Sequence, residues 1–100
     1  MAVRSSVVVT ENGDHRLSPQ IQDGQYLLAL SGDFGGATIE FFVDVFPASE
    51  APLGISYTEA GTSITWLPRC QGFVRVSGAG PTTNVGVSCS ELSSQHHRFN

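Results

Sequence analysis

The chain has 100 residues, of which 40% are hydrophobic and 14% are charged, and its formal net charge at pH 7 is −4. This length and hydrophobic content are typical of one globular domain and exclude a disordered linker. There is no lysine, and the five arginines are scattered along the chain: Arg4, Arg16, Arg69, Arg75 and Arg98. This scatter excludes the basic stripe that nucleic acids or an anionic membrane surface require.

The first residues, MAVRSSVVVTENGD, contain one arginine and a short run of valines. The run is too short for the core of a signal peptide, and no small-residue cleavage site follows it. No apolar stretch approaches the roughly 20 residues that span a bilayer. We therefore expect the protein to be made in the cytoplasm and used without secretion by the general route.

Short runs of alternating character, separated by turn residues, predict seven or eight β-strands. In chain order the strands are expected at residues 3–10, 15–21, 25–31, 37–45, 53–58, 62–67, 71–77 and 82–90. Pro19 marks the second as an edge strand, and two prolines make 46–52 a loop. No window keeps a helical period. The pattern predicts an all-β, single-domain β-sandwich, immunoglobulin-like or jelly-roll, over residues 1–92, with a polar tail at 93–100.

Two stretches of the chain repeat one pattern at a spacing of 46 residues. Residues 26–41 read YLLALSGDFGGATIEF, and residues 72–87 read GFVRVSGAGPTTNVGV. Laid over each other without a gap, Ser31-Gly32 falls on Ser77-Gly78. Each copy is an apolar alternating run, a glycine-rich turn and a second alternating run, which predicts a β-hairpin. A hairpin used twice favours two small sheets packed on each other.

The two cysteines allow two interpretations. If the last hairpin turns at Ala79-Gly80, Val74 lies opposite Val85 and Cys70 lies opposite Cys89. Both sulfur atoms then point inward as cross-strand neighbours, and a disulfide closing this loop would contribute roughly 3 kcal/mol. The alternative is two small buried hydrophobic side chains with free thiols. A protein that is not secreted stays in a reducing compartment, which favours the free thiols.

The residues that bind metals do not form a pattern. His96 and His97 are adjacent in the polar tail, where neighbouring residues face opposite sides, and His15 stands alone. Glu40 lies within a strand, whereas the other acids fall mostly in turns or at strand ends: Glu11, Asp14, Asp23, Asp33, Asp44, Glu50, Glu59 and Glu91. The sequence therefore predicts no metal site and no calcium loop.

Catalytic motifs are also missing from the sequence. No Gly-x-Ser-x-Gly elbow occurs, and the glycine-rich segment 32–36 joins two predicted strands instead of a strand and a helix. A pair of carboxylates cannot be recognised from spacing alone, and nothing points to one. We expect no enzyme activity, no cofactor and no catalytic residue.

The aromatic residues give two expectations. Trp66, Tyr57 and Tyr26 can line a sugar-binding face, but Trp66 alternates with Ile64 and is expected to be the central aromatic residue of the core. Phe41 and Phe42 are adjacent, so one of them must leave the core face. An exposed phenylalanine at that position would suit a subunit interface.

Four segments together resemble a family of small all-β virion proteins of tailed bacteriophages. They are GQYLLALSG at 24–32, GATI at 36–39, Leu-Pro at 67–68 and GFVRVSG at 72–78. In that family a G-x-Y-x-L-x-L-x-G strand leads to G-A-T-[VI], and L-P-x-G-x-Y/F-R-V-x-V-S-G comes near the end. Here the three residues 69–71 separate Leu-Pro from Gly72, which is a longer link than the family pattern.

The resemblance implies a structural protein that decorates or cements a capsid. Such a protein would bind the major capsid protein at the outer surface of the virion, as a trimer placed where shell subunits meet. A clamp that binds only the assembled lattice stabilises it through its affinity. The segments 1–6 and 96–100 would serve as arms that reach a neighbour. Family members act by fit, so no site residues carry over.

Two other functions stay open at this stage. One is a carbohydrate-binding or adhesion module of the same fold, because β-sandwiches host many functions. It predicts exposed aromatic residues, so an exposed Trp66 and Tyr57 would favour it. The other is a low-copy component of the head–tail junction or a fibre.

Overall fold

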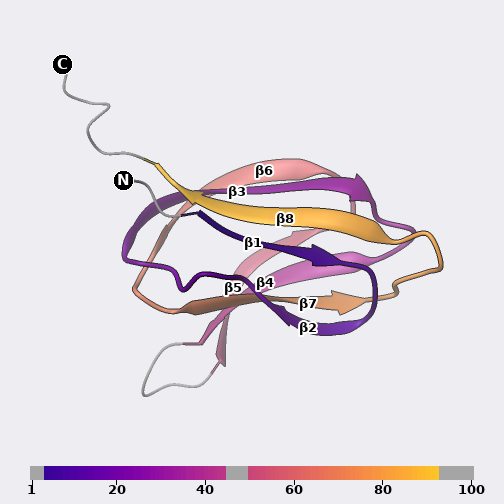
Figure 1. Cartoon of the computed structure of the whole chain (residues 1–100), viewed down its shortest axis with the longest axis horizontal. Coiled ribbons are helices and arrows are strands. Elements are labelled where there is room, and N and C mark those ends of the chain that lie inside the picture. Colours follow the sequence, from indigo (N-terminus) through magenta and orange to yellow (C-terminus); the bar gives the residue numbers. More distant parts are fainter. Residues whose placement is uncertain (1–3, 45–49, 93–100) are drawn as a thin grey trace.

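The computed structural model describes residues 4–44 and 50–92, which form two four-stranded antiparallel sheets packed face to face (Figure 1). The predicted β-sandwich is confirmed. The eight strands are β1 (Arg4–Val9), β2 (Gly13–Arg16), β3 (Gly24–Asp33), β4 (Thr38–Asp44), β5 (Glu50–Tyr57), β6 (Gly61–Leu67), β7 (Gln71–Ser77) and β8 (Asn84–Glu91). The predicted tail at 93–100 lies outside the described residues.

The strand order distinguishes the two sandwich types that the sequence left open. Sheet A has the order β1-β8-β3-β6, and sheet B has the order β2-β7-β4-β5. Among the strands of residues 4–44 and 50–92, only β4 and β5 are consecutive strands that pair with each other. Every other connection between consecutive strands crosses from one sheet to the other, which is the eight-stranded double Greek key of a jelly roll.

The two repeated segments are not hairpins, so that prediction is wrong. In the first copy β3 belongs to sheet A and β4 to sheet B, and in the second copy β7 belongs to sheet B and β8 to sheet A. Each glycine-rich turn therefore carries the chain across the sandwich. Two alternating runs joined by a short turn look the same in sequence whether the strands pair or face each other across a core.

The repeat nevertheless has a structural counterpart. The copies are equivalent under an exchange of the two sheets, because β3 pairs with β8 in sheet A and β7 pairs with β4 in sheet B. The turns of both copies contain glycines with positive φ, at Gly36 (90°) and Gly78 (73°). The carbonyl oxygen of Gly36 would lie 3.0 Å from a Cβ atom at Gly78, so the two turns pack against each other.

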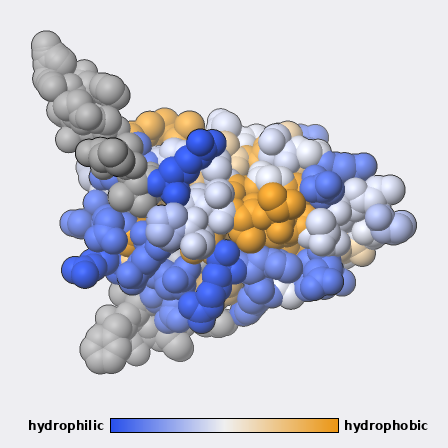
Figure 2. All heavy atoms as spheres, viewed as in Figure 1, coloured by the Kyte–Doolittle hydropathy of each residue, from blue (hydrophilic) through white to orange (hydrophobic). Residues whose placement is uncertain are grey.

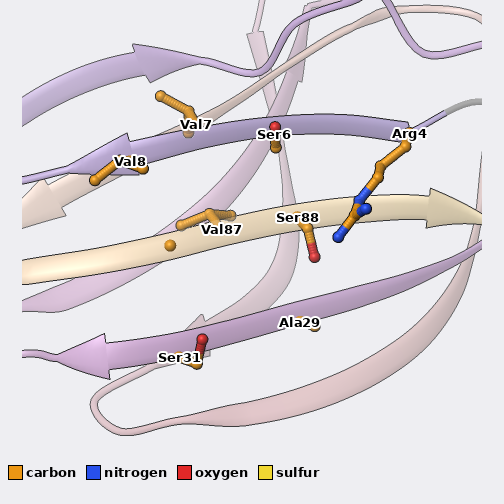
Figure 3. A pocket seen from close by; sticks show the side chains of 9 residues that line it. Arg4, Ser6, Val7, Val8, Ala29, Ser31, Val87 and Ser88 are labelled. Atoms are coloured by element: carbon orange, nitrogen blue, oxygen red, sulfur yellow. The ribbon is translucent and has the colours of Figure 1, made fainter.

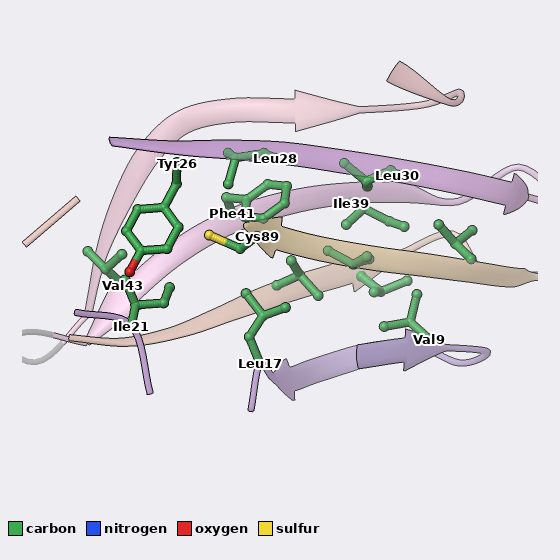
Figure 4. Packing of buried hydrophobic residues seen from close by; sticks show 14 of the residues in the cluster. Val9, Leu17, Ile21, Tyr26, Leu28, Leu30, Ile39, Phe41, Val43 and Cys89 are labelled. Carbon is green, nitrogen blue, oxygen red and sulfur yellow. The ribbon is translucent and has the colours of Figure 1, made fainter. Parts of the chain in front are cut away.

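One hydrophobic core fills the space between the sheets (Figure 4). Its largest fully buried side chains come from both sheets and from the segment between β2 and β3: Tyr26, Phe41, Leu17, Ile21, Leu28 and Ile39. The hydroxyl of Tyr26 donates a 2.7 Å hydrogen bond to the carbonyl of Gln22 and accepts a 3.1 Å bond from its N–H. Burial raises the pKa of this phenol. The polar end of the deepest aromatic residue is thereby satisfied.

The cysteines are both buried and both free. The predicted opposition of Cys70 and Cys89 is wrong, because β7 and β8 lie in different sheets. Cys70 forms an isolated bridge with Ile21, while Cys89 lies between Ser5 and Leu28 in sheet A. Burial raises the pKa of Cys70 to about 11 and that of Cys89 to about 12. The interpretation as small buried hydrophobic residues is confirmed.

Three predicted boundaries also differ from the structure. Residues 50–52 belong to β5 despite Pro52, and β2 ends at Arg16, after which only Ser18 and Ile21 form isolated bridges. Arg4–Val9 is strand β1, so residues 4–6 are part of sheet A and not of a free arm. The backbone of these residues pairs with β8, whereas the backbone of a free arm would face solvent. The suggested arm at 96–100 lies outside the described residues.

Candidate interaction surface

The outer face of sheet A carries few charges, because most of the residues that alternate to this side of its strands are uncharged. On β1 and β6 the outward positions are even-numbered, and the odd-numbered residues of β3 point the same way. Register places Ser6, Ser88, Ala29 and Thr62 side by side across the four strands. We call this surface the A face: Arg4, Ser6, Val8, Gln25, Leu27, Ala29, Ser31, Asp33, Thr62, Ile64, Trp66, Asn84, Gly86, Ser88 and Ser90.

A shallow groove of about 290 Å³ runs over the neighbouring strands β1, β8 and β3 of the A face. The groove forms because Gly86, Ser88 and Ala29 are small. Their side chains fill little of the space above the strands between Val8 and Ser31. Figure 3 shows the side chain of Arg4 laid across β8 toward Ser88 at one end of this groove. The groove lining holds serine hydroxyls and aliphatic carbons and, apart from Arg4, no charge.

Three large apolar side chains stand out from the A face. Val8 is 63% exposed, Ile64 is 59% exposed and Trp66 is 72% exposed. Val8 lies on edge strand β1, and the other two lie on the opposite edge strand, β6. In the space-filling view an apolar area covers the position of β1 in the middle of the face drawn (Figure 2). Exposed apolar side chains around a polar, uncharged surface are typical of an interaction site.

Trp66 does not lie in the core, so that prediction is wrong. Leu67 is buried, and alternation then places Trp66 and Ile64 outside, with Ser63 and Thr65 facing inward. Tyr57 fills the space beside these small inward residues. Its hydroxyl bonds with that of Ser63, and its ring packs edge-on against Phe41 at 6.3 Å.

The outer face of sheet B has a different character. Five of the side chains that the structure describes on this face are charged: Asp14, Arg16, Glu40, Asp44 and Arg75. Arg75 donates two hydrogen bonds to Asp14, at 2.8 and 3.0 Å, and hydrogen bonding to Arg75 lowers the pKa of that carboxyl. The two outer faces therefore differ in charge although they are built on the same strand pattern.

Phe42 is the phenylalanine that leaves the core side, as the sequence required, but it is not exposed. It stacks on Phe73 with ring centroids 5.3 Å apart, and the Arg75 guanidinium lies 4.4 Å from the centre of its ring. Only 7% of Phe42 is accessible. The expectation of an exposed phenylalanine is wrong, because the stacked Phe73 ring and the Arg75 guanidinium together cover the Phe42 ring.

The residues considered for chemistry are dispersed. His15 lies on the edge strand β2 with its ring bonded to the carbonyl of Glu11, and His96 and His97 lie outside the described residues. Within residues 4–44 and 50–92 no group of three or more His, Cys, Asp or Glu could hold a metal ion. The same part of the chain contains no helix that is long and apolar enough to cross a membrane.

Val8 and Ile64 are surface residues that were not predicted from the sequence. The signal for Val8 was present in the sequence, because three consecutive valines on a strand require at least one to face outward.

The sequence matches no model of a known protein family and no curated protein.

Proposed function

We propose that this protein is a non-enzymatic structural component of a phage particle that binds the outer surface of the capsid and stabilises the shell. The observation that carries the proposal is the A face, a four-stranded surface. Among its described residues only Arg4 and Asp33 are charged, and they lie near opposite ends of the surface. The cores of protein interfaces are depleted in charge in the same way. The jelly-roll strand order and the motif resemblance add to this, since capsid proteins use this fold widely.

The mechanism follows from binding linkage. A protein that binds the assembled lattice and not its dissociated subunits stabilises the lattice by an amount that grows with the logarithm of its concentration over its Kd. The A face would contribute affinity by excluding water from Val8, Ile64 and Trp66. The major capsid protein would be the partner, and the cysteines, both buried, would take no part.

Quantitative mass spectrometry of purified particles of the source phage tests this proposal. The copy number of this chain is measured against that of the major capsid protein. We expect comparable numbers, as a cement protein that covers the shell requires. A few copies per particle would reassign the chain to the head–tail junction or a fibre, and its absence from particles would overturn a virion role.

The exposure of Trp66 favours a second candidate, a carbohydrate-binding or adhesion module. Its partner across the strands on the A face is Gln25, which offers an amide for hydrogen bonds to hydroxyl groups. Tyr26 is buried and Tyr57 packs against the core, so neither adds a second exposed ring. A glycan array distinguishes the two functions: binding that is lost in Trp66→Ala would favour the module over the capsid protein.

A further inference from the structure

The two sheets have four edge strands, and three of them are protected against pairing with another chain. The edge of β1 is occupied at Ser6, whose backbone N–H and carbonyl bond those of Ser18 at 3.0 and 3.3 Å. Strand β2 has only four residues and carries Asp14 and Arg16. Strand β5 contains Pro52, which has no N–H to donate, and Gly54 with a φ of +76°. Short length, charge and proline are the usual means of blocking an edge.

Strand β6 has none of these protections. Its seven residues, GTSITWL, contain no charge and no proline, and they pair with β3 in an unbroken register from Gly61 to Leu67. In the part of the chain that the structure describes, β3 is the only strand that pairs with it. Alternate residues of an antiparallel edge strand direct their N–H and carbonyl groups away from the sheet. The free side of β6 is therefore an open template for one more strand.

We propose that β6 pairs with β6 of a second copy of this chain, antiparallel and about a two-fold axis at Ile64. Reversing the strand about this residue places Ile64 opposite Ile64 of the partner copy. It also places Thr62 opposite Trp66 on the A face and Ser63 opposite Thr65 on the inner face. Pairs of β-branched residues, and of aromatic with β-branched residues, are favourable cross-strand neighbours. No like charges meet anywhere along the strand.

The chemistry of the strand favours a second copy as the occupant. Each chain carries a net charge of −4, so two copies repel each other least when the surfaces that meet carry no charge. Strand β6 offers such a surface and is complementary to itself in the register given above. The pairing joins two A faces into one continuous eight-stranded sheet. Because the contact is isologous it closes after two copies, which gives a dimer instead of the trimer that the resemblance implies.

Sedimentation analysis of the purified protein tests the pairing without any capsid, so its outcome is independent of the proposed function. We expect the wild type to be a dimer at micromolar concentration. Ile64→Lys places two positive charges opposite each other at the two-fold axis, and we expect it to raise the dimer dissociation constant at least about tenfold. Because Ile64 is 59% exposed, the substitution leaves the core intact.

Val8→Lys is the matched control, since it makes the same change in charge at a similarly exposed position on the opposite edge of sheet A. We expect it to remain a dimer. Ile64→Glu alone should be monomeric, and an equimolar mixture with Ile64→Lys should form a heterodimer, because opposite charges then face each other. A monomeric or trimeric wild type, equal dissociation by Val8→Lys, or no heterodimer in the mixture would each overturn the proposal.

Discussion

The hydroxyl of Thr83 donates a 2.9 Å hydrogen bond to the carbonyl oxygen of Phe34, 49 residues earlier in the chain. The same hydroxyl oxygen accepts a 2.9 Å bond from the N–H of Gly80. Thr83 is buried, and the Phe34 carbonyl also accepts a bond from the N–H of Ala37. One side chain thus ties the turn of the first repeat to the turn of the second and closes that end of the sandwich.

Thr83→Val should destabilise the protein by about 1–3 kcal/mol, because it leaves the Gly80 N–H without its partner in a partly buried turn. The free energy of unfolding, measured by denaturant titration, checks this value. Thr82→Val makes the same chemical change at the exposed neighbouring position and should change stability by no more than about 0.5 kcal/mol. Equal effects of the two substitutions would show that the Thr83 hydrogen bonds contribute nothing.

Gly32→Ala should be more destabilising than Gly13→Ala, although both glycines have a similar φ, +127° and +115°. A Cβ atom at Gly32 would lie 2.2 Å from the backbone oxygen of Asn84, whereas one at Gly13 meets nothing within 4 Å. Backbone strain should cost about 1–3 kcal/mol in each variant. The steric conflict should add about 1–3 kcal/mol at Gly32 alone. Thermal unfolding of both variants measures the difference, and equal losses would contradict it.

The fold class could be predicted from sequence because it depends on alternation and turn spacing, which are local. The assignment of strands to sheets could not, because the turns at Gly36 and Gly78 allow either a hairpin or a crossing. Only the packing of those turns against each other distinguishes the two possibilities. The expected cross-strand pairing of Cys70 and Cys89 failed for the same reason, since it assumed that β7 and β8 form a hairpin.

The A face was less accessible to sequence reasoning than the core. On β6 the inward positions before the buried Leu67 are Gly61, Ser63 and Thr65, whereas Ile64 and Trp66 face outward, so most of this edge strand is more hydrophobic on its outer side. Hydrophobicity alone therefore placed Trp66 on the wrong face. Leu67, whose burial sets the alternation, was the residue that carried the correct information.

Alkaline pH should destabilise the protein through its buried thiols. Ordinary thiols have a pKa near 9.0, and burial raises those of Cys70 and Cys89 to about 11 and about 12. Between pH 9 and 11 the unfolded chain therefore releases protons that the folded chain retains. The free energy of unfolding is unaffected by these groups below pH 9 and falls as the pH rises above it.

Denaturant titrations between pH 7 and 11 measure this dependence. Cys89→Ala should flatten the decrease above pH 9, whatever it does to stability at pH 7. In the wild type at pH 8, both thiols should react with iodoacetamide only after denaturant is added, because the reactive species is the thiolate. Rapid alkylation of the native protein would show that the thiols are accessible, contrary to their burial.

Ser31→Arg should weaken binding to capsid shells if the A face is the binding surface. Ser31 is exposed and lines the groove, so an arginine there fills the groove and brings a charge that must be desolvated on contact. We expect the Kd for shells lacking this chain to rise at least about tenfold.

Ser56→Arg is the matched control, because Ser56 is an exposed serine on the outer face of sheet B, opposite Glu40. It should bind as the wild type does. Circular dichroism and the unfolding midpoint confirm that both variants fold. Stronger loss from Ser56→Arg than from Ser31→Arg would place the binding surface on sheet B, because the two substitutions differ only in which face of the sandwich receives the charge.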